Sequence, residues 1–221
     1  MAHHKPEVDG VMLRYGERSI LSGVYLKCTT GSVVGMLGRN GCGKSSLLKI
    51  IFGSLTAESQ SVRLDGKYVH RLYETENAVA YLPQRALLPS FLKVSQAVAL
   101  CVRNQNHREA LYRMGDLFRW KNSRVGELSG GTRRYLEVLA VLYSGARFVL
   151  LDEPFSHLSP VGVESLYPII AEQAQTKGIL ITDHVYQHVL RLCTETVLIQ
   201  DGRTLVVQNR EQLTEWGYLP E

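Results

Sequence analysis

Unbroken apolar runs along the chain predict the strands of a buried sheet. Residues 148–151, Phe-Val-Leu-Leu, have the composition of a strand buried on both faces of a parallel sheet. Residues 33–37, 78–82 and 178–182 predict further buried strands, the second of which Pro83 ends. Helical periods in residues 46–52 and 135–143 predict buried helices. This order of elements indicates an α/β fold.

Alternating apolar and polar residues predict half-buried antiparallel strands near both ends of the sequence. Residues 10–28 alternate in this way, with breaks at residues 16–18 and 22–23, which indicates a meander of strands. Asp65-Gly66 and Asp201-Gly202 are strong turn signals, so they predict two further hairpins, over residues 62–69 and 196–207.

Helical periods return between residues 85 and 127. Apolar residues there fall on two predicted helical faces, one with Val94, Ala97, Val98 and Cys101, the other with Leu111, Met114, Leu117 and Phe118. We expect one domain, residues 1–221, in which an α-helical subdomain (about 85–127) is inserted into a parallel-sheet core with an antiparallel β subdomain (about 8–84 and 128–221). A later helix, residues 160–177, is expected to be kinked or divided at Pro168.

Composition and charge narrow the classes of protein. The 221 residues are 45% hydrophobic and 21% charged, as in soluble globular proteins, and no run approaches the ~18 apolar residues of a membrane span. The first six residues lack the apolar core of a secretory signal, so we expect a cytoplasmic protein. Four widely spaced cysteines argue against a zinc site and a disulfide framework. The net charge of +4 does not indicate a nucleic-acid partner, and the densest basic cluster is interpreted as a solvated helical face: Arg119, Lys121, Arg124, Arg133 and Arg134.

A glycine-rich segment between a predicted strand and a predicted helix has the spacing of a phosphate-binding loop. Its glycines let backbone N–H groups surround a polyphosphate, Lys44 reaches the outer phosphates, and the Ser45 hydroxyl ligates Mg²⁺. The start of the following helix adds a partial positive charge. The alternative is a glycine-rich turn with a chance Lys-Ser pair, which the strand-loop-helix context disfavours. The expected nucleotide-binding residues are Gly38, Arg39, Asn40, Gly41, Cys42, Gly43, Lys44, Ser45 and Ser46.

Polar residues follow three of the predicted strands. Asp152 and Glu153 end the strand at residues 148–151, where ligands bind in open α/β sheets. Asp152 suits a hold on Mg²⁺, and Glu153 could accept a proton from an attacking water. Gln84 follows Pro83, and His184 follows residues 178–182, where it could sense a γ-phosphate or be structural.

Two further positions have a functional and a structural interpretation. Tyr15, beside the first strand break, could stack on a purine or pack against the sheet edge. Ser129 is placed to cap the helix that continues through residues 135–143, so the helix start could hold an anion or be a plain N-cap.

Together these motifs resemble the nucleotide-binding domain of the ATP-binding cassette (ABC) superfamily over nearly the whole chain, with Leu128-Ser129-Gly130-Gly131 similar to the family signature. The resemblance implies a P-loop NTPase core and a head-to-tail dimer, in which Ser129, Gly130 and Gly131 of one copy close over ATP held by the other. It implies adenine stacking for Tyr15, phosphate and Mg²⁺ contacts for Lys44 and Ser45, and metal and lytic-water contacts for Gln84. Glu153 is then the general base and His184 the switch histidine.

Two residues depart from the family pattern. Thr132 stands where the signature continues with Gln, which predicts tuned activity, and Ser159 stands where a carboxylate is usual, which puts coupling between the two ATP sites in doubt. The leading hypothesis is the homodimeric ATPase subunit of a transporter, docked through residues 85–91 on separate membrane subunits at the inner face of the membrane. The segments Asp152-Glu153-Pro154-Phe155 and Ile181-Thr182-Asp183-His184 are similar to those of the branch that contains lipopolysaccharide-export and branched-chain amino acid ATPases. The alternatives are a soluble ATPase of the iron–sulfur assembly type and a nucleotide sensor without turnover.

Overall fold

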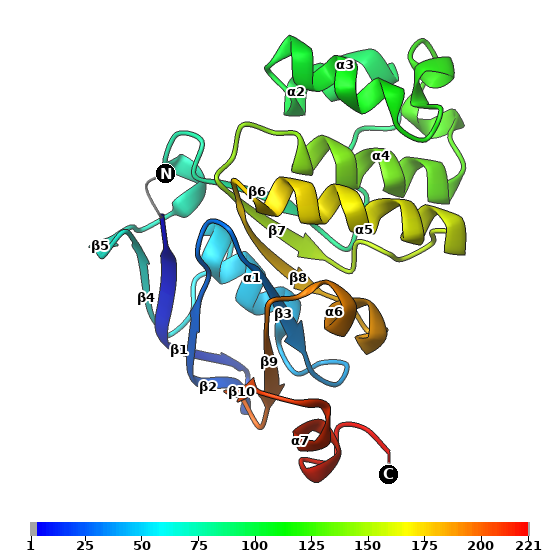
Figure 1. The fold of residues 1–221 in the computed structure, drawn as a ribbon. Helices are drawn as coiled ribbons and strands as arrows, with labels where there is room; N and C mark the ends of the chain where they lie inside the picture. The colour runs from blue at the N-terminus through cyan, green and yellow to red at the C-terminus, as the bar shows by residue number, and fades with distance from the viewer. Residues whose placement is uncertain (1–3, 221) are drawn as a thin grey trace.

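The computed structural model describes residues 4–220, so part of the N-terminal segment assessed for a secretory signal lies outside the described residues. The larger sheet has the strand order β10–β9–β3–β8–β7–β6 (Figure 1). The neighbours from β9 to β6 pair in parallel, whereas β10 pairs antiparallel with β9. Its strands are β3 (Val33–Leu37), β6 (Val79–Leu82), β7 (Phe148–Asp152), β8 (Gly178–Thr182), β9 (Glu195–Gln200) and β10 (Arg203–Val207).

Helices cover both faces of the larger sheet, which explains its unbroken apolar strands. One face packs on α4 (Gly130–Leu142) and α5 (Pro160–Ala174), and the other packs on α1 (Lys44–Phe52) and the smaller sheet. Two short helices, α6 (Tyr186–Leu192) and α7 (Arg210–Glu215), were not predicted. Within residues 4–220, no helix combines the length and the apolar character that crossing a membrane requires.

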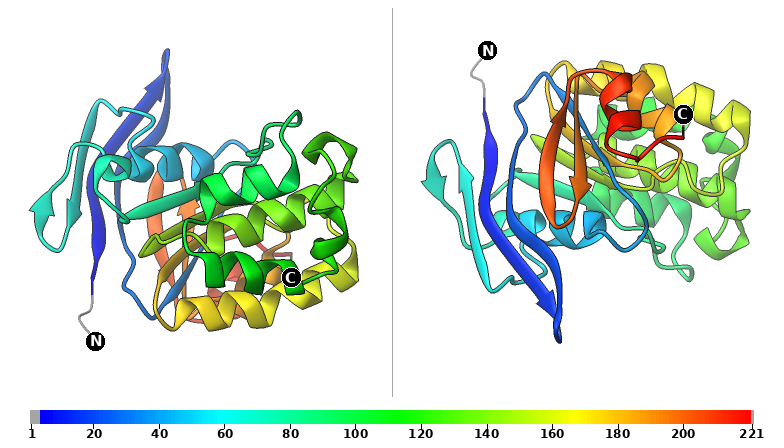
Figure 2. Two further views of the ribbon diagram at one scale, coloured as in Figure 1. Left: turned by 90° about the horizontal axis from the view of Figure 1, so that it is seen from above. Right: turned by 90° about the horizontal axis from the view of Figure 1, so that it is seen from below.

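The smaller sheet is antiparallel, with the order β2–β1–β4–β5, and lies along one flank, away from α4 and α5 (Figure 2). The predicted break at residues 22–23 is wrong, because β2 runs through it. Gly23 has a φ of 81° and is the extra residue where Val24 pairs with Val11 and Ser22 with Met12. It therefore forms a bulge rather than a turn. The strands are β1 (Pro6–Tyr15), β2 (Arg18–Lys27), β4 (Ser59–Leu64) and β5 (Lys67–Tyr68).

The segment between β6 and α4 is helical and lies over α4 at one end of the molecule (Figure 1). It contains α2 (Val94–Cys101), α3 (Gln105–Arg113) and the 3₁₀ turns Leu117–Trp120 and Val125–Glu127; a further 3₁₀ turn, Leu72–Glu74, precedes β6. The expected second face is partly wrong, because α3 ends before Met114 and Phe118 is 68% exposed on a 3₁₀ turn. Leu111 and Leu117 are buried as expected.

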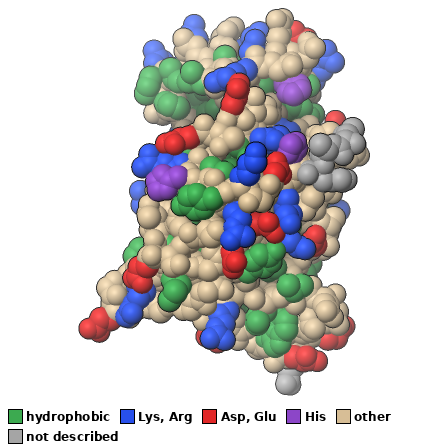
Figure 3. All heavy atoms as spheres, turned by 90° about the vertical axis from the view of Figure 1, so that its left-hand side faces the viewer, with side chains coloured by type: hydrophobic (Ala, Val, Ile, Leu, Met, Phe, Trp, Pro, Cys, Tyr) green, Lys and Arg blue, Asp and Glu red, His purple; other side chains and the backbone are tan. Residues whose placement is uncertain are grey.

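Two other expectations about helices need correction. α5 is one continuous helix with Pro168 inside it, so the expected division does not occur, and the helix ends at Ala174 rather than residue 177. The interpretation of the basic cluster as a solvated face fails for Arg134, which is 4% exposed. On the face shown in Figure 3, basic and acidic side chains are intermixed, and hydrophobic side chains gather near the end where α2 and α3 lie.

Candidate functional site

The loop between β3 and α1 has a backbone shape that only glycine adopts freely. Gly38 and Gly43 have φ values of 154° and 107°, in the region that L residues avoid. A Cβ on Gly43 would lie 2.8 Å from Leu21 Cδ2, and one on Gly38 would lie 2.5 Å from Cys42 Sγ. These glycines therefore allow both the turn and the close packing of the loop against its neighbours.

The loop ends at a helix N-terminus suited to an anion. Among the described residues, no side chain caps α1, so its first N–H groups are available to a ligand. Lys44 is only 8% exposed, and its Nζ donates to the carbonyl oxygens of Gly38 (2.6 Å) and Arg39 (3.2 Å). The ammonium therefore lies within the loop, where it can reach bound phosphates.

Ser45 and Asp152 meet across the start of α1 and the end of β7. Ser45 Oγ donates to Asp152 Oδ1 (3.0 Å), and the Tyr81 hydroxyl donates to Asp152 Oδ2 (3.0 Å). Burial raises the pKa of the Asp152 carboxyl above its usual range, against these hydrogen bonds, which lower it. A hydroxyl and a carboxylate are ligands that Mg²⁺ prefers, so this donor set fits the ion.

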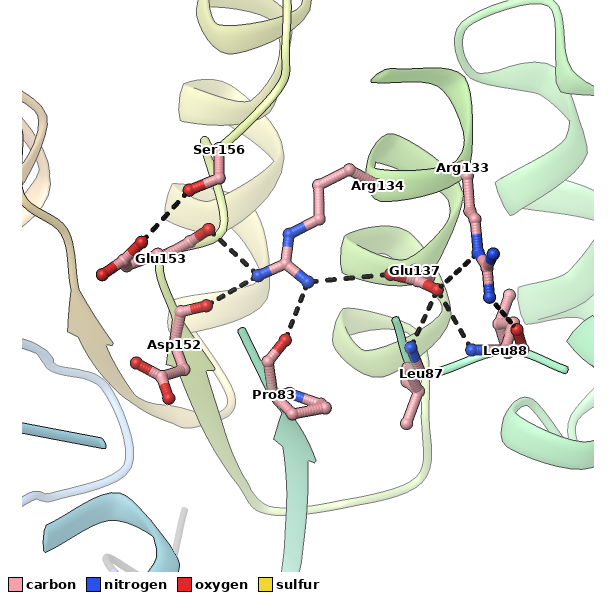
Figure 4. Close-up of polar contacts among 9 residues, drawn as sticks. All are labelled: Pro83, Leu87, Leu88, Arg133, Arg134, Glu137, Asp152, Glu153 and Ser156. Carbon is pink, nitrogen blue, oxygen red and sulfur yellow. Dashed lines mark hydrogen bonds and ion pairs between the residues drawn. The ribbon is translucent and has the colours of Figure 1, made fainter. Parts of the chain in front are cut away.

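The Glu153 carboxylate is the meeting point of three elements. Its Oε2 accepts hydrogen bonds from Gln84 Nε2 (3.0 Å) and Ser156 Oγ (3.3 Å; Figure 4), and lies 3.7 Å from His184 Nδ1. Gln84, Glu153 and His184 follow β6, β7 and β8, three neighbouring parallel strands whose carboxyl ends share one edge. The structure thus brings these three predicted residues together.

The residue before His184 is a buried carboxylate. Asp183 is 1% exposed, its Oδ1 accepts from the backbone N–H of Val185 (2.8 Å), and burial raises the pKa of its carboxyl. The His184 side chain is 53% exposed. The bend after β8 is therefore anchored on its inner side, with the imidazole left accessible.

Tyr15 lies at the end of β1, next to the loop. Tyr15 is 54% exposed, and its hydroxyl shares a hydrogen bond with Ser46 Oγ (3.3 Å). An exposed aromatic residue beside the loop is open to a base, and stacking on a purine stays a prediction.

The outer part of the loop faces the C-terminal segment. Arg39 Nη2 donates to the carbonyl oxygen of Gly217 (2.9 Å). A hollow of about 500 Å³ is lined by residues of both segments, among them Arg39, Asn40, Gly41, Cys42, Trp216 and Tyr218. The Arg39 side chain is thus engaged within the chain.

The predicted signature residues lie apart from this site. Ser129 caps α4: its Oγ accepts from the backbone N–H of Thr132 (3.1 Å) and lies 2.8 Å from Thr132 Oγ1. A Cβ on Gly131 would lie 2.9 Å from the carbonyl oxygen of His157, whereas Gly130 faces open space. Within residues 4–220, no hydrogen bond joins residues 128–132 to residues 38–46, so the two predicted parts of the site are not assembled within one chain.

Some polar residues of the site were not predicted. Tyr81 and Ser156 hydrogen bond the two carboxylates, and Arg134 donates to the backbone carbonyl oxygens of Asp152 and Glu153. The spacing of Ser156, three residues after Glu153, is the one sequence signal that could have indicated such a contact.

Comparisons with known proteins identify the family. The family model described as ABC transporter matches residues 21–156, more than half of the chain. The chain belongs to the ABC transporter family. This ABC chain is 29% identical over 221 residues to the lipopolysaccharide export system ATP-binding protein LptB of Acidithiobacillus ferridurans, covering 95% of this chain and 92% of the relative. It is 31% identical to the hemin import ATP-binding protein HmuV of Pseudomonas fluorescens, covering 91% and 85%.

Solved structures agree on the fold. A structure described as the ATP binding subunit of an ABC transporter superposes with a TM-score of 0.83 at 23% identity, covering 98% of this chain and 95% of that one. The predicted P-loop NTPase fold is therefore confirmed. The expected membership of the ABC ATPases is also confirmed, including the likeness to lipopolysaccharide-export ATPases. This ABC protein is an ATP-binding subunit and an ATPase that acts in transport.

Proposed function

We propose that this ABC ATPase hydrolyses ATP as a head-to-tail dimer and drives transport through separate membrane-spanning subunits. The observation that carries the proposal is the convergence of Gln84, Ser156 and His184 on the Glu153 carboxylate, beside the loop that contains Lys44. A carboxylate oriented by an amide and a hydroxyl is suited to take a proton from water.

The chain's own residues would divide the chemistry as follows. The N–H groups of the loop and Lys44 hold the triphosphate, and Tyr15 stacks on the adenine. Glu153 accepts the proton of the attacking water, Gln84 orients that water, and His184 donates a hydrogen bond to the γ-phosphate.

Magnesium fits the same site. Ser45 and Asp152 would hold Mg²⁺, with Gln84 nearby, and the ion would neutralise charge on the phosphates. All the other roles above belong to side chains and backbone groups of this chain.

The separation of the two parts of the site supports the proposed dimer. Ser129, Gly130 and Gly131 make no hydrogen bond with the loop of their own chain in the described residues, so the signature of a second copy would supply the remaining contacts to the phosphates. Thr132 shares a hydrogen bond with the Ser129 hydroxyl, which supports the expectation that the ATPase activity is tuned rather than lost. Ser159 caps α5 by accepting from Gly162 N–H. As a serine, it offers no carboxylate to the partner copy.

The membrane subunits would dock at the helical subdomain, about residues 85–127. Phe91 and Leu100 are 69% and 70% exposed in this segment, and hydrophobic side chains gather at this end of the face in Figure 3. We propose that the membrane subunit contacts residues 85–91 of this chain, which then lies at the cytoplasmic face of the membrane. One relative is named for export and another for import, so the direction and the substrate would be set by the membrane subunits.

A soluble ATPase of the iron–sulfur assembly type is the second candidate. The exposed Phe91 and Leu100 could equally contact a soluble partner. Affinity purification from detergent-solubilised membranes distinguishes the two: an integral membrane protein supports the transporter, and soluble partners alone support the assembly role.

The decisive experiment replaces the proposed base. Glu153→Gln keeps the size and the hydrogen bond to Gln84 but removes the proton acceptor, so ATP binding should persist while turnover falls by at least about 100-fold. Glu164→Gln, on the surface of α5 and paired with Arg191, is the matched control and should retain wild-type turnover. Wild-type hydrolysis by the Glu153→Gln chain would contradict the proposed mechanism.

A further inference from the structure

An arginine and a glutamate are buried together near the start of α4. Arg134 and Glu137 are 4% and 2% exposed, and Arg134 Nη1 lies 3.6 Å from Glu137 Oε2 (Figure 4). Taking both charges out of water is costly unless their remaining hydrogen-bonding groups find partners. Most of the partners that they find are backbone groups next to the catalytic residues, whereas Arg134 Nε has no hydrogen-bond partner among the described residues.

The guanidinium of Arg134 joins the ends of two strands. Nη1 donates to the carbonyl oxygen of Pro83 (2.8 Å), and Nη2 donates to those of Asp152 (2.6 Å) and Glu153 (3.0 Å). Pro83 ends β6 immediately before Gln84. One planar group therefore fixes the backbone from which both the Gln84 and the Glu153 side chains extend.

The backbone of Glu153 needs such support. Its φ is 50°, in the left-handed region, which is unfavourable for a residue with a Cβ. Its N–H donates to the carbonyl oxygen of Thr182 on β8 (2.8 Å), and its own carbonyl oxygen accepts from Arg134. The strained turn is held from both sides, and its side chain is directed toward Gln84 and His184.

The carboxylate of Glu137 holds the chain that follows Gln84. Its Oε1 accepts from the backbone N–H groups of Leu87 (2.9 Å) and Leu88 (3.0 Å), and from Arg133 Nε (3.2 Å). Arg133 also donates to the carbonyl oxygen of Leu88. The segment on which we place the membrane subunit is thus attached to the same turn of α4 as the catalytic backbone.

We propose that Arg134 and Glu137 are positioning residues for hydrolysis, which set the orientation of Glu153 and Gln84 through their backbone and tie both to residues 87–88. This inference rests on the proposed role of Glu153 as the base. Helix α4 begins at the signature, so one rigid element carries the signature at its first turn and the backbone contacts of the base one turn later.

Arginine substitutions test the first half of the proposal. Lysine keeps the charge but is a point donor that cannot serve three carbonyl oxygens as the planar guanidinium does. Misplaced catalytic groups lose rate steeply, so kcat should fall by about 10-fold in Arg134→Lys and about 100-fold in Arg134→Met. KM for ATP should stay unchanged, because the hydrogen bonds of Arg134 go to Pro83, Asp152 and Glu153 rather than to the phosphate-binding loop or the signature.

A structural role would give a different result. Val138→Ala shortens a fully buried, apolar side chain of the same helix and should lower the melting temperature without lowering kcat. Arg134→Lys in a Glu153→Gln background should reduce turnover no further than Glu153→Gln alone, because Arg134 acts through Glu153.

Glutamate substitutions test the second half without relying on activity. Glu137→Gln keeps an oxygen for Leu87 and Leu88 N–H and should preserve their slow amide hydrogen exchange. Glu137→Leu leaves both N–H groups unpaired, so exchange in residues 84–92 should accelerate while α1 stays protected.

Each outcome decides one proposal. Folded Arg134 variants with wild-type kcat, or with a raised KM and unchanged kcat, overturn the inference, as does unchanged exchange in Glu137→Leu. If Arg134→Met does not fold, Arg134→Lys decides alone. Wild-type turnover by Glu153→Gln would instead contradict the proposed function. If Glu153→Gln loses turnover but Arg134→Lys keeps full turnover, only this inference is contradicted.

Discussion

At the scale of single residues, the four free cysteines differ in their surroundings. Burial raises the pKa of the Cys28 thiol to about 12 and also raises the pKa of Cys101 and Cys193. Cys42 is half-buried in the phosphate-binding loop, with its Sγ 3.9 Å from Lys44 Nζ. The reactive form of a cysteine is the thiolate, so raised pKa values protect the first three, of which Cys28 is buried and Cys101 and Cys193 are half-buried like Cys42.

We therefore expect maleimide to modify Cys42 first and to block ATP binding, because the adduct would occupy the loop. Bound ATP should slow the reaction, and the Cys42→Ala control should lose the fast labelling but bind ATP. Mass spectrometry of labelled peptides gives the order of modification, and calorimetry gives the binding. Undiminished ATP binding by Cys42-labelled protein would contradict this expectation.

Residue types and spacing were sufficient to indicate much of the candidate site. Lys44, Ser45 and Glu153 could be found from sequence because their chemistry depends on a local backbone, the strand end and the helix start, that a short motif encodes. Arg134 could not, because a charged residue in an amphipathic pattern is normally exposed. Its partners are carbonyl oxygens at residues 83, 152 and 153, which only the tertiary fold brings to α4.

At the scale of elements, α5 contains a favourable and an unfavourable proline. Pro160 is at the first turn, where its missing N–H costs nothing. Pro168 lies in the middle of the helix, on its solvent-exposed side. The helix continues there, although proline has no N–H to donate to the carbonyl oxygen of Glu164. Pro168→Ala should therefore raise the free energy of unfolding by about 1–2 kcal/mol, since the lost rigidity of the unfolded chain offsets part of the gain.

Thermal unfolding measures this difference as a rise of about 2–4 °C for each kcal/mol in a chain of this length. Pro160→Ala is the matched control, and it should leave the melting temperature unchanged or lower it. A melting temperature that falls in Pro168→Ala would mean that the proline is needed for packing.

Strong periodicity explains which elements could be predicted. Strands β3, β7 and β8 and helix α4 carry long apolar patterns because they are buried. In contrast, α6 and α7 each bury one residue, Val189 and Leu213, too few to produce a visible period. The bulge at Gly23 was mistaken for a turn because glycine has the same positive φ in both.

At the scale of the whole molecule, the separation of loop and signature predicts complementation between inactive chains. Lys44→Ala removes the phosphate contact. Gly130→Asp adds a negative charge at an exposed position with room for a side chain, and should repel the phosphates of the partner's ATP. In a head-to-tail dimer, mixing the two variants creates one complete site, from the loop of one chain and the signature of the other.

We expect each variant alone to be inactive in an ATPase assay and the mixture to recover partial turnover. Gly130→Asn, similar in size to aspartate but uncharged, is the control and should remain active alone. If the signature acted on its own chain, mixing would restore nothing, and the head-to-tail arrangement would be wrong.

The placement of β3 between β8 and β9 has a consequence for synthesis of the protein. β3 pairs with residues 179–182 on one side and residues 195–198 on the other, all of which leave the ribosome long after it. Contacts so distant in sequence form slowly and late. A nascent chain that has emerged only to α5 therefore carries the whole glycine-rich motif but lacks both neighbours of the strand that leads into it. We therefore expect the capacity to bind nucleotide to arise only after β8 and β9 have left the ribosome.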